Sequence, residues 1–174
     1  MLIGASLLSE GFTADLRNRK FIFAATDALP NEEVLAVLPY TTPEDGPIRS
    51  PVVEFEIGGE KILGVFDTGA PYSLWKFRSE EPGHLAEVKR TDFHIDQSGQ
   101  LVRFPVLMRR ESMRLGTLGF ELDVAYLPDS WPEYLPGCVY GMDIPAALGA
   151  ERFVLDPETQ EIRFYRRLEV AVSG

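Results

Sequence analysis

Short runs in which apolar and polar residues alternate, each closed by a turn signal, make up most of the chain. Residues 52–57 and 61–66 are two such runs, and Gly58-Gly59 lies between them. Because glycine accepts the positive φ of a tight primed turn, this pattern predicts a β-hairpin. A further short apolar run over residues 73–77 predicts the next strand.

The same reasoning predicts more strand pairs and one short helix further along the chain. A second hairpin is expected around a polar tip and a third around a glycine-containing turn, followed by a helix and two closing strands. These elements are expected at 93–95 with 101–107, at 112–115 with 120–127, at 144–148 for the helix, and at 153–155 and 161–165 for the closing strands. Repeated short strands with one helix predict an all-β fold, a small barrel or sandwich.

The N-terminal part of the chain is set apart by composition. Residues 41–48 have the composition of a linker, so we expect an N-terminal strand segment and linker over 1–48 and the main domain over 49–174. Residues 12–23 match the pattern of residues 153–164 without a gap: a strand ends at Asp, a polar turn follows, and a second strand continues. This predicts either the last hairpin of a preceding lobe or an unrelated Asp turn, since such turns are common.

The match extends upstream of both segments. Leu2-Ile3-Gly4 and Val139-Tyr140-Gly141 each place an apolar pair and a glycine before a short apolar helix candidate. A disordered or wholly helical N-terminal segment would contradict the idea of a preceding lobe.

Composition and charge exclude several classes of function. The formal net charge is −10, and the longest basic cluster, Arg17 to Lys20, is short. Nucleic-acid binding needs clustered basic residues, so no nucleic-acid partner is expected. No apolar run is long enough to span a bilayer, and the first residues lack a basic n-region, so we expect no membrane partner and a cytoplasmic location.

Cysteine and histidine are too scarce for several kinds of chemistry. The chain has one cysteine, Cys138, and two histidines, His84 and His94. One cysteine excludes an intrachain disulfide and a cysteine metal cage, and no Gly-x-Ser-x-Gly turn accompanies the histidines. We therefore expect no metal and no cofactor.

The segment from Val65 to Ala70 carries the clearest chemical signal. Asp67 stands at the end of an apolar strand, where burial and neighbouring groups can tune a carboxylate. Gly69 allows a tight turn and the close approach of another backbone, and Thr68 offers a hydroxyl to a partner loop. The simplest alternative is an Asp that only starts a turn.

The sequence Asp67-Thr68-Gly69-Ala70 after an apolar strand resembles the active-site loop of retropepsin-like aspartic proteases, including their bacterial members. The Gly-Gly hairpin lies immediately before it, as in that family. Val139-Tyr140-Gly141, leading into a short helix, is similar to the second family signature. The resemblance covers about residues 49–165 and implies a retropepsin-like barrel with one short helix, two lobes of which are brought together by dimerisation.

The resemblance also implies an activity and roles for residues. The chain would be an aspartic-type endopeptidase, a hydrolase that cleaves peptide or protein substrates through a water held by the paired Asp67 carboxylates of a homodimer, without a cofactor. The implied catalytic residue is Asp67, the supporting residues are Thr68, Gly69, Ala70 and Gly141, and the candidates for the flap are Gln97, Ser98, Gly99 and Gln100.

Two departures from the family pattern and two other functions stay open. Pro71 stands where viral members carry an acidic residue that anchors substrate, and the flap tip has a single glycine, Gly99. A non-catalytic dimerisation or peptide-binding module of the same fold is one alternative, and an unrelated β-barrel binding protein is the other. Asp143 and Asp156 are interpreted as a helix cap and a turn residue.

Overall fold

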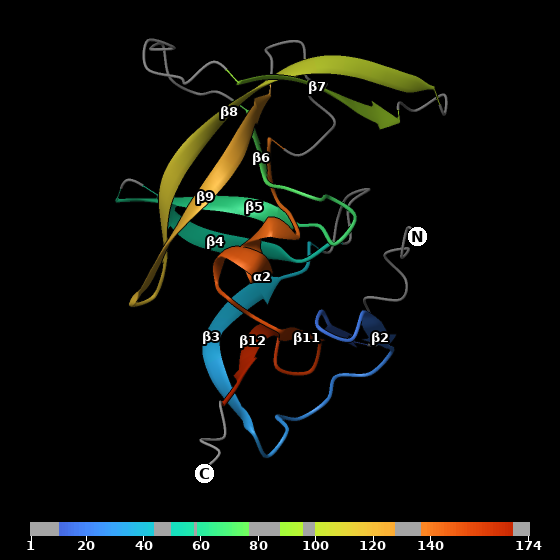
Figure 1. Ribbon diagram of the computed structural model, residues 1–174, viewed down its shortest axis with the longest axis vertical. Coiled ribbons are helices and arrows are strands. Elements are labelled where there is room, and N and C mark those ends of the chain that lie inside the picture. The colour runs from blue at the N-terminus through green and yellow to red at the C-terminus, as the bar shows by residue number, and fades with distance from the viewer. Residues whose placement is uncertain are drawn as a thin grey trace, which may run out of the picture.

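The structure, a computed structural model, describes residues 11–43, 50–57, 59–76, 88–95, 100–127 and 137–168 (Figure 1). Apart from one short helix, the elements of these residues are strands, which confirms the all-β prediction. They are β1 (Phe12–Asp15), β2 (Lys20–Ile22), β3 (Glu32–Thr41), β4 (Val52–Ile57), β5 (Glu60–Phe66), β6 (Leu74–Lys76), β7 (Val88–Ile95), β8 (Leu101–Leu115), β9 (Leu118–Leu127), β10 (Cys138–Tyr140), α2 (Asp143–Ala147), β11 (Arg152–Asp156) and β12 (Glu161–Arg167).

Six of the strands close into a barrel. Their order is β4-β5-β10-β6-β9-β8, and β8 returns to β4 through the pair Glu56 and Arg114. Strand β8 is long enough to serve two hairpins, because its first half pairs with β7 and its second half with β9. In Figure 1 the β7 end of the molecule lies farthest from β11 and β12.

The remaining strands extend the sheet away from the barrel in the order β2-β1-β11-β12-β3. Strand β3 connects the two parts, because it pairs with β12 along most of its length and reaches β4 only through Tyr40 and Thr41. The N-terminal strands therefore lie in the same sheet as the C-terminal ones, at the end of the molecule opposite β7 (Figure 1).

Aromatic side chains join the barrel to this extension. Phe66 at the end of β5 packs edge-to-face on Phe153 of β11, with ring centroids 5.8 Å apart. Phe153 also contacts Phe12 of β1 at 5.5 Å, and all three rings are almost completely buried. The burial of large apolar side chains is the main force that holds such a fold together, so this aromatic row fixes the extension against the barrel.

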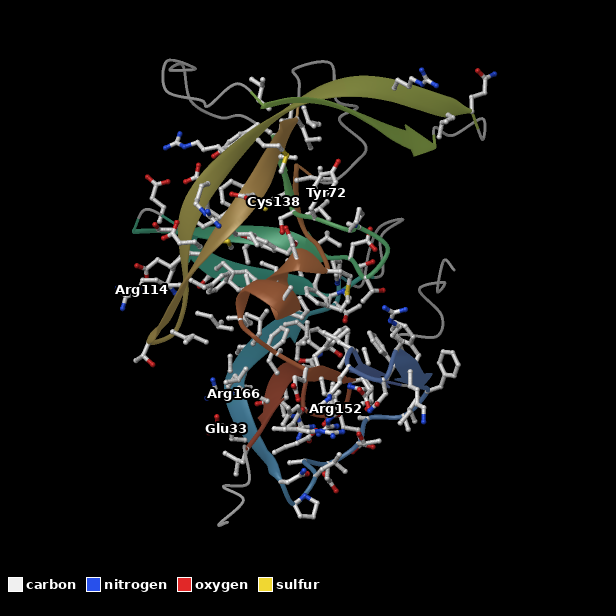
Figure 2. The ribbon with its side chains drawn as sticks, viewed as in Figure 1. Glu33, Tyr72, Arg114, Cys138, Arg152 and Arg166 are labelled. Atoms are coloured by element: carbon white, nitrogen blue, oxygen red, sulfur yellow. The ribbon has the colours of Figure 1, made fainter. Side chains whose placement is uncertain are left out.

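A buried ion pair between Glu32 and Arg152 holds the start of β3 to β11. The guanidinium Nε of Arg152 donates to both carboxylate oxygens of Glu32 at 3.0 Å, and its Nη1 donates to Thr26 Oγ1 at 2.8 Å. The guanidinium also lies 4.2 Å from the ring centroid of Tyr165. Figure 2 shows Arg152 in the half of the molecule away from Cys138 and Tyr72. Replacing one residue of such a pair lowers the free energy of unfolding strongly, because the remaining buried charge has lost its partner.

The predicted strands and the helix are present where the structure describes them, but β7 begins at Val88 and β9 at Leu118, earlier than expected. Strand β3 was not predicted, and it includes Thr41 of the expected linker. Strands β4 and β5 pair as the predicted hairpin up to Ile57 and Glu60, and Gly59 between them has a φ of +87°. The second and third predicted hairpins are β7–β8 and β8–β9, and the predicted helix is α2. The flap candidates Gln97, Ser98 and Gly99 and residues 44–48 of the expected linker lie outside the described residues. None of the helices in the described ranges is long and apolar enough to cross a membrane.

Candidate active site

The Asp67 loop begins where β5 ends and passes over the end of β10. Strand β10 runs parallel to β5, with Tyr140 paired to Phe66, and antiparallel to β6 on its other side. The backbone N–H of Asp67 donates to the carbonyl of Tyr140 at 2.9 Å. Asp67 is thus fixed by its backbone directly after the last residue of β5, Phe66, which is buried.

A short turn holds the carboxylate of Asp67. The N–H of Gly69 donates to Asp67 Oδ1 at 2.8 Å, and the N–H of Ala70 donates to the carbonyl of Asp67 at 3.1 Å. Asp67 is exposed, Thr68 is half-buried and Ala70 is buried. Among the described residues nothing else donates a hydrogen bond to this carboxylate, so one of its oxygens is available to a ligand or to a second carboxyl group.

Gly141 lies directly against the Asp67 loop and forms its floor. A Cβ at this position would lie 2.6 Å from the carbonyl carbon of Tyr72 and 2.8 Å from the carbonyl oxygen of Ala70. The same carbonyl of Ala70 accepts the N–H of Met142 at 2.9 Å. Only glycine permits this approach of two backbones. The structure therefore brings Gly141 together with the Asp67 loop.

Ser73 and Asp143 form a brace that the sequence analysis missed. Asp143 accepts the backbone N–H of Ser73 at 2.7 Å and its hydroxyl at 2.9 Å, and the N–H of Gly141 donates to Ser73 Oγ at 3.1 Å. Ser73 is completely buried. Burial raises the pKa of the Asp143 carboxyl, and the hydrogen bonds from Ser73 offset part of this rise.

The interpretation of Asp143 as a helix cap is wrong. Residue Met142 occupies the N-cap of α2, and no side chain caps this helix. The carboxylate of Asp143 instead points across to the end of the Asp67 loop at Ser73. A serine that ends the loop and an aspartate two residues after Gly141 were the available signals, but they are far apart in the sequence. Asp156, by contrast, is a turn residue as expected, because it accepts the N–H groups of Glu158 and Thr159.

Tyr140 supports the floor of the loop from below. Its hydroxyl donates to the carbonyl of Ile62 at 2.9 Å, and its ring lies 4.6 Å from that of Phe55. Burial raises the pKa of this hydroxyl, so it stays protonated and acts as a structural donor. The loop thus stands on a rigid, apolar base.

Asp67 carries the exposed carboxylate of the candidate site. In the ranges that the structure covers, no three His, Cys, Asp or Glu side chains gather as metal ligands would. Of the flap candidates only Gln100 is described, and it lies exposed next to the first residue of β8. The arrangement consists of one open carboxylate on a loop that is held from both ends.

No protein-family model matches this chain, and no curated protein sequence matches it. Its function is therefore inferred from its own residues and from the closed β-barrel that carries them.

Proposed function

We propose that this chain is one lobe of an aspartic endopeptidase, in which Asp67 shares a proton with the equivalent aspartate of a second lobe. The observation that carries the proposal is the exposed Asp67 carboxylate, held by Gly69 directly after β5 over a floor made by Gly141. A catalytic carboxylate needs this combination of fixed position and open access.

The chemistry follows from two carboxyl groups that lie close together. Ionising both groups at once is unfavourable because the two negative charges repel each other. Their apparent pKa values therefore separate, as in the known aspartic proteases. The ionised group removes a proton from a bound water, whose oxygen attacks the peptide carbonyl carbon. The protonated group donates its proton to the carbonyl oxygen. When the tetrahedral intermediate collapses, the C–N bond breaks and a proton passes to the leaving amine.

The other residues of the loop have supporting roles in this proposal. Thr68 of each lobe would hydrogen-bond to the loop of the other lobe, and Ala70 keeps the floor low. The segment from Gln97 to Gln100 would close over the substrate and exclude water. One source of the second aspartate is another copy of the chain, which would form a homodimer with an isologous interface.

A non-catalytic module of the same fold, used for dimerisation or peptide binding, is the alternative. Pro71 favours it, because proline has no N–H to donate and no charge with which to anchor a substrate backbone. This alternative predicts two lobes that associate normally while the Asp67 carboxylates stay apart and no peptide bond is cleaved.

The test compares the protein with Asp67→Asn on a denatured protein substrate from pH 3 to pH 7, with and without a statine-type transition-state analogue. We expect cleavage that the analogue blocks and that the substitution lowers at least about 100-fold, the usual contribution of a general base. Asp123→Asn is the matched control, since Asp123 is an exposed carboxylate on β9. Cleavage that survives Asp67→Asn would contradict the proposal, as would a folded, paired protein without any cleavage.

A further inference from the structure

The first and last hairpins of the described chain have the same turn. Asp15 ends β1 and accepts the N–H of Asn18, and Asp156 ends β11 and accepts the N–H of Thr159, the equivalent residue. Each turn closes with a non-glycine residue in the left-handed region, Arg19 and Gln160, both with a φ of 54°. We call β1–β2 the N-terminal hairpin and β11–β12 the C-terminal hairpin.

The two hairpins are related by a local two-fold axis. Thr13 pairs with Val154, which is its own equivalent in the C-terminal hairpin. Phe12 pairs with Leu155, and the equivalents of these two, Phe153 and Ala14, pair with each other. Exchanging each residue for its equivalent in the other hairpin therefore leaves the pairing between β1 and β11 unchanged. The two-fold axis of an antiparallel pair is perpendicular to the sheet, so equivalent side chains lie on the same face.

The hairpins differ in what covers that face. Ile162 and Phe164 of the C-terminal hairpin are 0% exposed, whereas their equivalents, Phe21 and Phe23, are 41% and 52% exposed. Strand β12 is followed in the sheet by β3, but β2 is the last strand on its side of the described sheet. The N-terminal hairpin thus has the apolar residues of a lobe interior, and among the described residues no lobe covers them.

The axis also passes close to the candidate active site. Phe66, the residue before Asp67, packs on Phe153, which lies next to Val154 at the axis. A second lobe placed by this axis would bring its own equivalent of Phe66 onto Phe12, the equivalent of Phe153. Its aspartate would then lie near Asp67, on the same face of the sheet.

A complete second copy of the chain cannot occupy this position. Its C-terminal hairpin would fall on the N-terminal hairpin of the first copy, because the axis exchanges the two. We propose that Phe21, Phe23 and the free edge of β2 bind a second lobe of the same fold that lacks a terminal hairpin of its own, and that residues 12–23 complete it. This inference rests on the proposed function only for the role of the second aspartate.

The experiment joins a copy of residues 25–151 directly to Gly11, so that residues 12–23 follow the added lobe as residues 153–164 follow the original one. Both lobes carry the substitution Asp67→Cys, and Cys138→Ala removes the other thiols. With a short thiol–thiol cross-linker we expect the yield of internal cross-links to exceed the intermolecular yield of the unfused chain about tenfold or more, since fusion raises the local concentration. An added lobe that stays unfolded, or that folds without cross-linking, overturns the inference.

Two paired variants locate the contact. Phe23→Glu is expected to reduce the cross-linking of the fusion to background and to leave the urea midpoint of the unfused chain nearly unchanged. Leu63→Glu is the matched control, because Leu63 is an apolar residue of β5 that is 63% exposed, and it should not affect cross-linking. Equal effects of the two variants would overturn the inference.

Two further measurements separate this inference from the alternatives. A fusion that cross-links when both lobes carry Asp67→Cys, but cleaves no substrate when both lobes keep Asp67, would preserve the docking and refute the protease. In a second experiment, Thr13→Cys and Val154→Cys form a disulfide that holds the N-terminal hairpin on β11. If the unfused chain with this disulfide still cross-linked efficiently, a second copy of the chain would be the partner. That result would overturn the inference.

Discussion

The N-terminal and C-terminal hairpins show that a local sequence can determine a turn without determining its burial. Both have an aspartate that accepts at least one backbone N–H of the turn and a left-handed residue before the second strand. In one of them Phe164 is completely buried, while in the other the equivalent Phe23 is half exposed. The turn depends on neighbouring residues, whereas burial depends on a distant element, β3 and the barrel, that covers only one of the hairpins.

The largest expected difference between the hairpins concerns these two phenylalanines. Phe164→Ala should lower the free energy of unfolding by about 3–5 kcal/mol, because it leaves a cavity among buried rings that include Phe153. Phe23→Ala should cost less than about 1 kcal/mol, since half of its side chain is already in water. Urea unfolding followed by circular dichroism measures both. Similar losses would mean that Phe23 is covered in solution.

A smaller difference is expected between the two turn aspartates. Asp156 is buried, accepts two turn N–H groups and forms an ion pair with Arg163, whereas Asp15 serves a more exposed turn. Asp156→Ala should therefore cost about 2 kcal/mol and Asp15→Ala less than about 1 kcal/mol. Equal costs in urea unfolding at neutral pH would argue that both turns are anchored in the same way.

The same aspartates predict a dependence on pH. Burial raises the pKa of Asp156, but the turn N–H groups and Arg163 outweigh it, so that its pKa is lowered from 3.8 in the folded state. A lowered pKa contributes stability above the unfolded value, and this contribution is lost as the pH falls through the folded value. Asp156→Asn should therefore lose less stability than the parent protein between neutral pH and pH values below 3.8. A parallel loss in both proteins would contradict this.

The sequence predicted the parts of the fold that depend on near neighbours. The Gly58-Gly59 turn, the helix over Asp143 to Ala147 and the Asp156 turn are each encoded within a few residues. Hydrophobic alternation added strands such as β4, in which buried and more exposed residues alternate. The position of Asp67 directly after an apolar strand followed from the same pattern.

The contacts that shape the candidate site are not local and could not be predicted in this way. Strand β10 lies between β5 and β6 in the sheet, although it comes much later in the sequence. The brace joins Ser73, just before β6, to Asp143, which follows β10. Propensity treats Asp143 as a helix cap, because an aspartate near a helix start usually is one. In the structure the Asp143 carboxylate instead binds Ser73, because the buried N–H and hydroxyl of Ser73 need a hydrogen-bond acceptor.

The start of each hairpin gives a third test of the comparison. Gly11 stands where the C-terminal hairpin has Arg152. It has a φ of +78°, and a Cβ there would lie 2.8 Å from Pro157 Cδ and 3.0 Å from the carbonyl oxygen of Leu155. Gly11→Ala should cost about 2 kcal/mol, from left-handed strain together with this contact.

The matched control for Gly11 is Gly116→Ala. Gly116 also has a positive φ, +61°, but open space around it, so its substitution should cost only the strain, about 1 kcal/mol. Thermal unfolding of both variants gives the difference. If Gly11→Ala were the milder of the two, the N-terminal hairpin would be free to shift away from Leu155.

The smallest expected effect is one in which the hairpins should agree. Arg19 and Gln160 hold the same left-handed conformation, which costs an ordinary residue about 1–2 kcal/mol and glycine almost nothing. Arg19→Gly and Gln160→Gly should each stabilise the protein by about 0.5–1 kcal/mol after the greater freedom of glycine in the unfolded chain is subtracted. Glu158→Gly, in the same turn as Gln160 but without a positive φ, should instead destabilise it slightly. Because the strain is set by the turn alone, equal gains would show that the two turns are equivalent even though only one hairpin is covered. A gain at Gln160 without one at Arg19 would mean that the N-terminal turn is not held in this conformation in solution.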